Sequence, residues 1–171
     1  YRLYEFDITA AVRRDGPNAL AVEVFPPEPD DLAWTWVDWN PAPPDKNMGL
    51  WRGVSVTTSG DATIRSPHVV SRVDPSRRRA DLTVVAEVRN LSDRAVLGTL
   101  RGRIEAVQFS QTVELGPRET RVVRFTPEAF AQLRVANPRL WWPAELGAPN
   151  LSQLDLEFAV GAVISDRRRT T

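Results

Sequence analysis

The chain of 171 residues contains no cysteine, one histidine, one lysine and one methionine. Without cysteine there is no disulfide, no thiolate metal site and no cysteine nucleophile. The histidine, His68, stands directly after Pro67, where a lone imidazole is far more often a surface residue than a base or a ligand. The sequence therefore excludes cysteine chemistry and gives little support to histidine chemistry.

A basic excess, long apolar runs and nucleotide-binding motifs are missing as well. The formal net charge is zero, with 22 basic and 22 acidic residues, whereas a nucleic-acid binder normally carries a basic excess. No apolar run approaches the ~18 residues of a membrane-spanning helix, and no secretory signal pattern is present. Because no G-x-G-x-x-G, P-loop or G-x-S-x-G motif occurs, we expect no cofactor and neither nucleic acid nor a membrane as partner.

Two arginine runs interrupt this balance, at residues 77–79 and 167–169. The first lies near Asp74 and Asp81, and the second follows Asp166. Mixed charge of this kind is typical of a solvated surface. We therefore interpret each run as a solvated turn.

Alternating apolar residues predict an all-β chain, because side chains on a strand point to opposite faces in turn. The predicted strands are 19–25, 50–58, 68–73, 80–90, 96–104, 107–115, 119–125, 154–160 and 162–168. The predicted core consists of Leu82, Val84, Val88, Leu154, Leu156 and Phe158. One helix is predicted, at 127–134, with Thr126 as its N-cap. About seven strands separated by turns over residues 67–171 indicate an immunoglobulin-like antiparallel β-sandwich.

Residues 1–66 contain too few predicted strands for a complete sandwich. The sequence opens without methionine on a strand-like segment, so we expect the true N-terminus and the missing strands to precede Tyr1. A stretch rich in proline and tryptophan follows at 26–49, and a connection of this length is usually functional or disordered. Three tryptophans in it argue against disorder, because aromatic rings need a packing partner.

Acidic residues in this stretch allow two kinds of site. Five oxygen-bearing side chains gather there: Asp30, Asp31, Asp38, Asp45 and Asn47. EF-hand spacing is absent, so a solvated loop is favoured over a calcium site, and no metal is assigned. Asp38 beside Trp39 is a credible sugar-contact pair, because sugar C–H faces stack on aromatic rings while hydroxyls bond to carboxylates. A hydrophobic plug between domains explains the same residues equally well.

Several segments, in this order along the chain, resemble those of glycoside hydrolase family 2, in particular its exo-β-D-glucosaminidase (exochitosanase) branch. They are Phe6–Thr9, Asn18–Val22, Asp38–Pro41, Pro44–Arg52, Asn137–Pro143, Asn150-Leu151 and Ser165–Arg167. The resemblance implies that residues 1–66 are the C-terminal part of a jelly-roll (galactose-binding-like) sugar-binding domain. It also implies that residues 67–171 are the sandwich that precedes a catalytic (β/α)₈ barrel.

The resemblance further implies a retaining glycosidase that acts on chitosan chain ends, with this segment as a non-catalytic accessory part that packs on a barrel beyond Thr171. In that family both catalytic glutamates lie in the barrel, so no catalytic residue is assigned to this chain. Asp38 and Trp39 are the candidate substrate-binding residues, and secretion from a bacterium is expected. The alternatives are the same segment of a β-mannosidase, or a stand-alone carbohydrate-binding or adhesion module.

Overall fold

The structure is a computed structural model of the chain, and it describes residues 4–25, 49–50 and 52–171. By its contacts the chain divides into two compact units, Tyr1–Ser55 and Val56–Thr171. The division falls earlier than the boundary after residue 66 that the sequence suggested, because the first strand of the second unit already begins at Ala62. Among the residues that the structure describes, none belongs to a helix with the length and apolarity that crossing a membrane requires.

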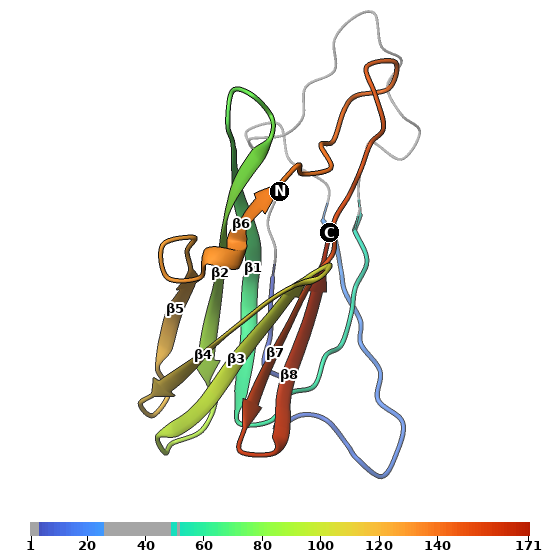
Figure 1. The fold of residues 1–171 in the computed structure, drawn as a ribbon. Helices are drawn as coiled ribbons and strands as arrows, with labels where there is room; N and C mark the ends of the chain where they lie inside the picture. The colour runs from blue at the N-terminus through green and yellow to red at the C-terminus, as the bar shows by residue number, and fades with distance from the viewer. Residues whose placement is uncertain (1–3, 26–48, 51) are drawn as a thin grey trace, which may run out of the picture. The chain divides into compact units, whose positions relative to one another are not determined.

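The second unit consists of β-strands and one short 3₁₀-helix (Figure 1). In chain order these are β1 (Ala62–Val73), β2 (Arg79–Asn90), β3 (Val96–Ile104), β4 (Val107–Leu115), β5 (Thr120–Phe125), η1 (Ala131–Leu133), β6 (Arg134–Ala136), β7 (Leu154–Val160) and β8 (Val163–Thr170). All named strand pairs are antiparallel.

The strands form two sheets that pack as a sandwich. The first sheet has the order β1-β2-β5, with the short β6 also paired to β2, and the second has the order β4-β3-β7-β8. The chain crosses between the sheets after β2, after β4 and after β6. Successive pairs of strands therefore lie alternately in the first and the second sheet. This is the strand arrangement of an immunoglobulin-like domain, which confirms the fold predicted for this part of the chain.

The core lies between the two sheets, and the alternation of apolar residues explains which side chains enter it. Val84 and Val88 of β2 and Leu156 and Phe158 of β7 are no more than 2% exposed. Leu154 is buried too, and Leu82 is partly buried against the same cluster. The predicted core is therefore confirmed.

Two glycines of β3 make room for aromatic rings in this core. Gly98 lies against the ring of Phe158, and Gly102 lies against the ring of Phe109, its partner across the ladder between β3 and β4. A Cβ at either position would overlap the ring. A glycine in a strand weakens the strand by itself, so here the loss is offset by close aromatic packing.

Three predicted elements are wrong. Residues 127–134 do not form the predicted helix: a single turn, closed by the Phe130 N–H donating to the Thr126 carbonyl at 2.8 Å, leads into η1, and β6 begins directly after it. Phe130 and Leu133 pack on the core, and the helical turn ends because Arg134–Ala136 pair with β2. No strand is assigned to the described residues of 19–25 and 50–58, since neither segment has a hydrogen-bonded ladder partner among the described residues.

The first unit has local turns held by side chains. The Asn18 amide accepts from the Arg13 N–H at 2.9 Å and donates to the Arg13 carbonyl at 2.8 Å, which closes the turn around Gly16. The Asp7 carboxylate accepts from the Thr9 N–H at 3.0 Å. Asn and Asp commonly stabilise turns in this way. The jelly-roll assignment of this unit stays a prediction.

A buried polar cluster joins the two sheets where β1 and β8 meet. We call it the clasp; it consists of Ser165, Asp166 and Arg168 of β8 with Ala62, Thr63 and Ile64 of β1. Opposite the neighbouring residues Phe158 and Ala159, β8 carries one extra residue, Ser165, which makes a β-bulge. A bulge changes the direction of side chains along a strand. It explains why the consecutive residues Ser165 and Asp166 are both buried, at 7% and 6% exposed.

The two side chains bond to three successive residues of β1. Ser165 Oγ accepts from the Ala62 N–H at 2.8 Å and donates to the Ala62 carbonyl at 2.7 Å. Asp166 Oδ2 accepts from the Thr63 hydroxyl at 2.8 Å and from the Ile64 N–H at 2.7 Å. Arg168 pairs with the same carboxylate at 3.2 Å. The clasp therefore satisfies a buried charge completely, as burial demands.

We predict that Asp166→Ala destabilises the chain by about 3 kcal/mol, because it leaves buried donors and the Arg168 charge without a partner. The free energy of unfolding is measured by urea denaturation. Asp93→Ala is the control, since Asp93 is 83% exposed and pairs with Arg118 at the surface, where ion pairs contribute little. Equal shifts of the urea midpoint for the two variants would contradict the role of the clasp.

Candidate functional site: an arginine–carboxylate face on the second sheet

The candidate residues from the sequence are not placed by the structure. Asp38 and Trp39, together with the acidic residues considered for calcium, lie outside the described residues. His68 is in β1, with its Nδ1 3.0 Å from the Ser66 carbonyl oxygen. Among the described residues no group of His, Cys, Asp and Glu side chains has the arrangement to hold a metal ion.

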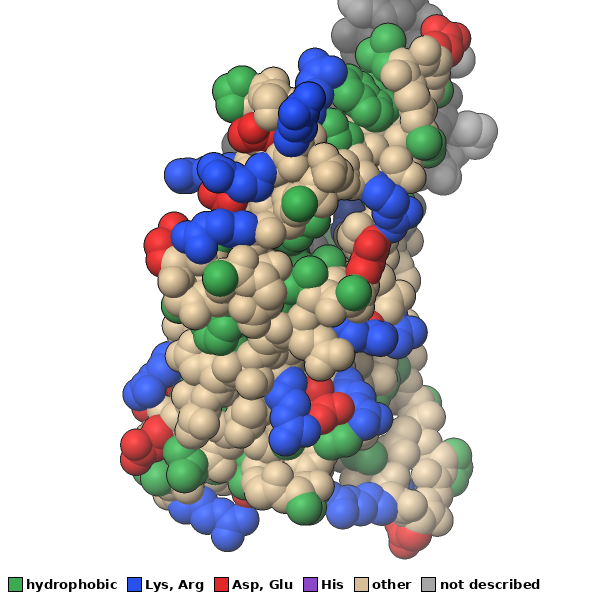
Figure 2. Space-filling model, viewed as in Figure 1, with side chains coloured by type: hydrophobic (Ala, Val, Ile, Leu, Met, Phe, Trp, Pro, Cys, Tyr) green, Lys and Arg blue, Asp and Glu red, His purple; other side chains and the backbone are tan. Residues whose placement is uncertain are grey.

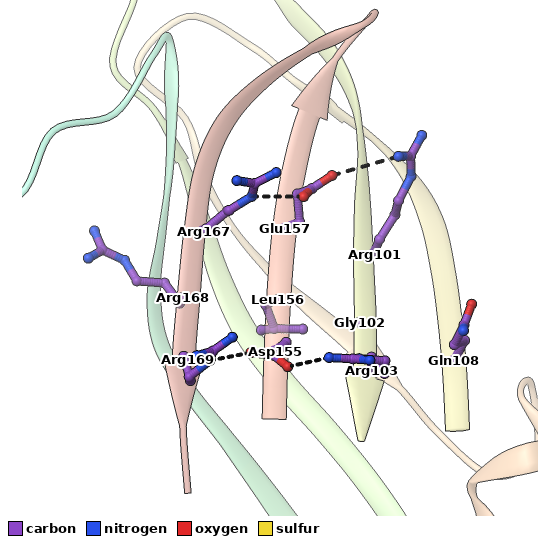
Figure 3. Close-up of a pocket in the computed structure, with 10 residues that line it drawn as sticks. All are labelled: Arg101, Gly102, Arg103, Gln108, Asp155, Leu156, Glu157, Arg167, Arg168 and Arg169. Atoms are coloured by element: carbon purple, nitrogen blue, oxygen red, sulfur yellow. Dashed lines mark hydrogen bonds and ion pairs between the residues drawn. The ribbon is translucent and has the colours of Figure 1, made fainter. Parts of the chain in front are cut away.

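The described part of the chain does contain one polar hollow, of about 640 Å³, on the outer face of the second sheet. Its floor is formed by β3, β7 and β8, and it is bounded by Gln108 of β4 (Figure 3). In the lower part of the face shown in Figure 2, where Figure 1 draws these strands, basic side chains lie next to acidic ones. We call this the arginine–carboxylate face; its charged members are Arg101, Arg103, Asp155, Glu157, Arg167 and Arg169.

The register of the sheet places these residues in two rows. Arg101 pairs with Glu157, which pairs with Arg167 on its other side; Arg103, Asp155 and Arg169 form the next row. Within each strand the two members are two residues apart and so point to the same face. Arg168 lies between two of them in β8, and its side chain points away from the hollow (Figure 3), where it reaches the clasp.

Each carboxylate lies between two guanidinium groups. Asp155 accepts from Arg169 Nε at 2.7 Å and from Arg103 at 3.1 Å. Glu157 accepts from Arg167 Nε at 3.0 Å, and its other oxygen is 3.7 Å from Arg101. Opposite charges directly across a ladder stabilise strand pairing. The rows therefore favour this register of β3, β7 and β8.

The arginines and Gln153 lower the pKa of one acid of this face, Asp155. The hydrogen bond from Arg169, followed by those from Gln153 and Arg103, lowers the pKa of Asp155 from 3.8 to about 2. Four guanidinium groups surround two carboxylates, so the face has a formal excess of two positive charges. Beyond this face, the pKa of Glu105 is lowered as well, chiefly by its hydrogen bond with Arg139 and then by that with Ser152.

This arrangement is unsuited to acid/base hydrolysis of a glycoside. A glycosidase needs one carboxyl group that stays protonated near neutral pH, which requires a raised pKa, and a second one that is free to attack or to activate water. Asp155 has a lowered pKa, and Glu157 lies between two arginines. The lowered pKa of Asp155 makes it a poor proton donor, and both carboxylates of the face are already paired with arginines.

The interpretation of residues 167–169 as a solvated turn is wrong. They lie in β8, with Arg167 and Arg169 on the outer face and Arg168 toward the clasp. Residues 77–78 do lie in the turn before β2, which starts at Arg79. Sequence reasoning missed the face because it considered charges as runs. The signal was the spacing of two residues that recurs in Arg101/Arg103, Asp155/Glu157 and Arg167/Arg169.

The second unit is thus an all-β sandwich, and the two carboxylates of its charged face, Asp155 and Glu157, are each paired with two arginines. The sequence pattern of the family "Glycosyl hydrolases family 2" matches residues 62–171, which is the whole of the described sandwich. The chain belongs to glycosyl hydrolase family 2.

Relatives of known name cover nearly the whole chain. The exo-β-D-glucosaminidase of Streptomyces avermitilis is 42% identical over 168 residues, 97% of this chain and 18% of that protein. The exo-β-D-glucosaminidase of Amycolatopsis orientalis is 39% identical over 171 residues, 99% of this chain and 16% of that protein. The mannosylglycoprotein endo-β-mannosidase of Lilium longiflorum is 32% identical over 188 residues, covering 94% of this chain and 19% of that protein.

A solved relative has the same fold. The crystal structure of the exo-chitosanase of Amycolatopsis orientalis superposes with a TM-score of 0.70 at 38% identity, covering 82% of this chain and 16% of that one. The chain thus spans less than a fifth of the length of the relatives it matches.

We predict that the Asp155 carboxyl titrates near pH 2 in the folded chain, measured by ¹³C NMR of its carboxyl group. Because its pKa is lowered on folding, the stabilising contribution of Asp155 is complete above the ordinary pKa of 3.8 and is lost as the pH falls toward 2. In Arg169→Gln the pKa of Asp155 rises toward its ordinary value, whereas Arg79→Gln leaves it unchanged. A pKa of 3.8 or above for Asp155 in the unaltered chain would refute this account.

Proposed function

We propose that the chain is a non-catalytic accessory segment of a retaining exo-β-D-glucosaminidase that acts on the ends of chitosan chains. Two relatives that bear this enzyme name are 42% and 39% identical to it over nearly its full length. The lily endo-β-mannosidase, at 32% identity, makes a β-mannosidase the second candidate, and the higher identities favour the glucosaminidase.

One observation carries the non-catalytic assignment. The two neighbouring carboxylates of the hollow are each paired with two arginines, and the pKa of Asp155 is lowered to about 2. A general acid for glycoside hydrolysis needs the opposite shift. The acid/base and nucleophilic carboxylates of the proposed enzyme therefore belong to another part of it, and by family resemblance this is a (β/α)₈ barrel that follows the sandwich.

The proposed role of the sandwich is that of a rigid domain that packs beside the barrel. The clasp suits such a role, because it fixes β8, the last strand, to the first strand of the same unit through buried bonds. Because β8 is held in this way, the chain that follows it starts from a fixed position and direction. Chitosan is a polymer that cells do not take up whole, so we propose that the enzyme is exported.

We predict that the purified chain hydrolyses neither aryl β-D-glucosaminide nor chitosan oligomers above the rate in buffer. The reason is that both carboxylates of the hollow are paired with two arginines each, and that the pKa of Asp155 is lowered. The longer enzyme that contains this segment should release glucosamine in the same assay. Turnover by the chain alone that disappears in Glu157→Gln would overturn the non-catalytic assignment.

For the longer enzyme we also propose that Asp38 and Trp39 help to close the subsite for the terminal sugar. The support is chemical: a carboxylate bonds to a hydroxyl or ammonium group, and an aromatic ring stacks on a sugar face. The neighbouring Pro41, Pro43 and Pro44 restrict the conformations of this segment and lower the cost of ordering it.

Asp38→Ala in the longer enzyme is expected to lower kcat/KM about tenfold or more, because loss of a charge-assisted hydrogen bond costs ~1.5–3 kcal/mol. The melting temperature should stay the same. A lower melting temperature with normal kinetics would instead favour the hydrophobic plug. Asp15→Ala, an exposed carboxylate of the same unit, serves as the matched control.

A further inference from the structure

We propose that the arginine–carboxylate face is a binding site for an acidic polysaccharide, that is, a sugar polymer with repeated carboxylate groups such as a polyuronate. This goes beyond the accessory role, because it gives the sandwich a ligand of its own. The face combines an excess of two positive charges with an accessible hollow of about 640 Å³.

The arginines of β8 are held in place for binding by the protein's own carboxylates. Arg167 donates from Nε to Glu157, and Arg169 donates from Nε to Asp155. The terminal nitrogens of both arginines make no hydrogen bond to any described residue. These nitrogens form the planar fork that binds carboxylates in a bidentate manner. Because the internal bonds restrain the side chains, less rotamer entropy is lost when a ligand binds.

The arginines of β3 complete a two-by-two array. The Arg101 side chain makes no hydrogen bond to a described residue, only an ion pair at 3.7 Å, and the Arg103 side chain uses one terminal nitrogen for Asp155. All four arginine side chains are more than half exposed. Residues two apart on a strand are about 7 Å apart, and β3 and β8 are separated by about two strand spacings, or roughly 10 Å. Such an array suits a ligand with several anionic groups better than a single ion.

The chemistry of the hollow favours a saccharide over other polyanions. Gln108 contributes a neutral amide at the margin of the arginines, and an amide bonds well to sugar hydroxyls. The array is flat and confined to one sheet face, while the chain as a whole is formally neutral, unlike a typical nucleic-acid binder. Membership of a glycosyl hydrolase family agrees with a sugar ligand.

The test measures binding of a defined oligogalacturonate to the full 171-residue chain by isothermal titration calorimetry at low ionic strength. Parallel titrations use inorganic phosphate, poly-L-glutamate and a chitosan oligomer. We expect saturable binding of the oligouronate that weakens with added salt, and weaker or undetectable binding of the other three probes.

The double variant Arg167→Gln/Arg169→Gln should bind oligouronate at least about tenfold more weakly. The matched control, Arg79→Gln/Arg94→Gln, removes the same charge and two surface ion pairs outside the hollow, and should change the affinity less than about twofold. If the first double variant does not fold, Arg101→Gln replaces it, because the Arg101 side chain makes no hydrogen bond to a described residue.

Three results would overturn the proposal. The first is no binding of the oligouronate, and the second is equal loss of binding in the two double variants, which would reflect net charge alone. The third is binding of poly-L-glutamate as tight as that of the oligouronate, which would indicate an acidic protein as the partner. None of these outcomes affects the assay for glucosamine release, so the proposed function stands or falls separately.

Discussion

The sandwich depends on a carboxylate that is buried where its two sheets meet. Asp166 bonds to Thr63 and Ile64 and pairs with Arg168, so β1 of one sheet and β8 of the other are joined by charge-assisted bonds rather than by apolar contact. Between β4 and β5 the joint is aromatic: the rings of Phe109 and Phe125 lie 4.7 Å apart. The apolar pattern of the strands already favours one register, and the hydrogen bonds of the clasp to successive residues of β1 add to it. The clasp therefore reinforces the alignment of β1 and β8 that the core requires.

Strand β8 connects the clasp to the charged face. Its alternation sends Arg168 toward Asp166 and sends Arg167 and Arg169 to the outer surface. The bulge at Ser165 sets this phase, because a shift by one residue would exchange the two sets of arginines. Such a shift would bury Arg167 and Arg169 without a partner and leave the Asp166 charge uncompensated. The same backbone geometry thus determines both the closure of the sandwich and the charge of its surface.

The sequence predicted the sandwich well where apolar residues alternate between clear turns, as in 80–90 and 154–160. It failed where tertiary contacts decide. The segment 127–134 has helix-forming residues, yet its last residue already pairs with Asp81 of β2 as the start of β6. The bulge that creates the clasp leaves no mark in the composition of β8, so Ser165 and Asp166 drew attention only through family resemblance. The charged face was missed because its members come from three distant strands, and only the register brings them together.

The excess of arginine on this face bears on the proposed substrate of the longer enzyme. Glucosamine units carry ammonium groups, and a surface with an excess of two guanidinium charges repels them. If the longer enzyme acts on chitosan as proposed, the face does not compete with the active site for substrate. Exposed acidic side chains in its place would bind the cationic polymer without hydrolysing it. Pairing each carboxylate with two arginines removes that competing site and leaves a surface complementary to sugars of the opposite charge.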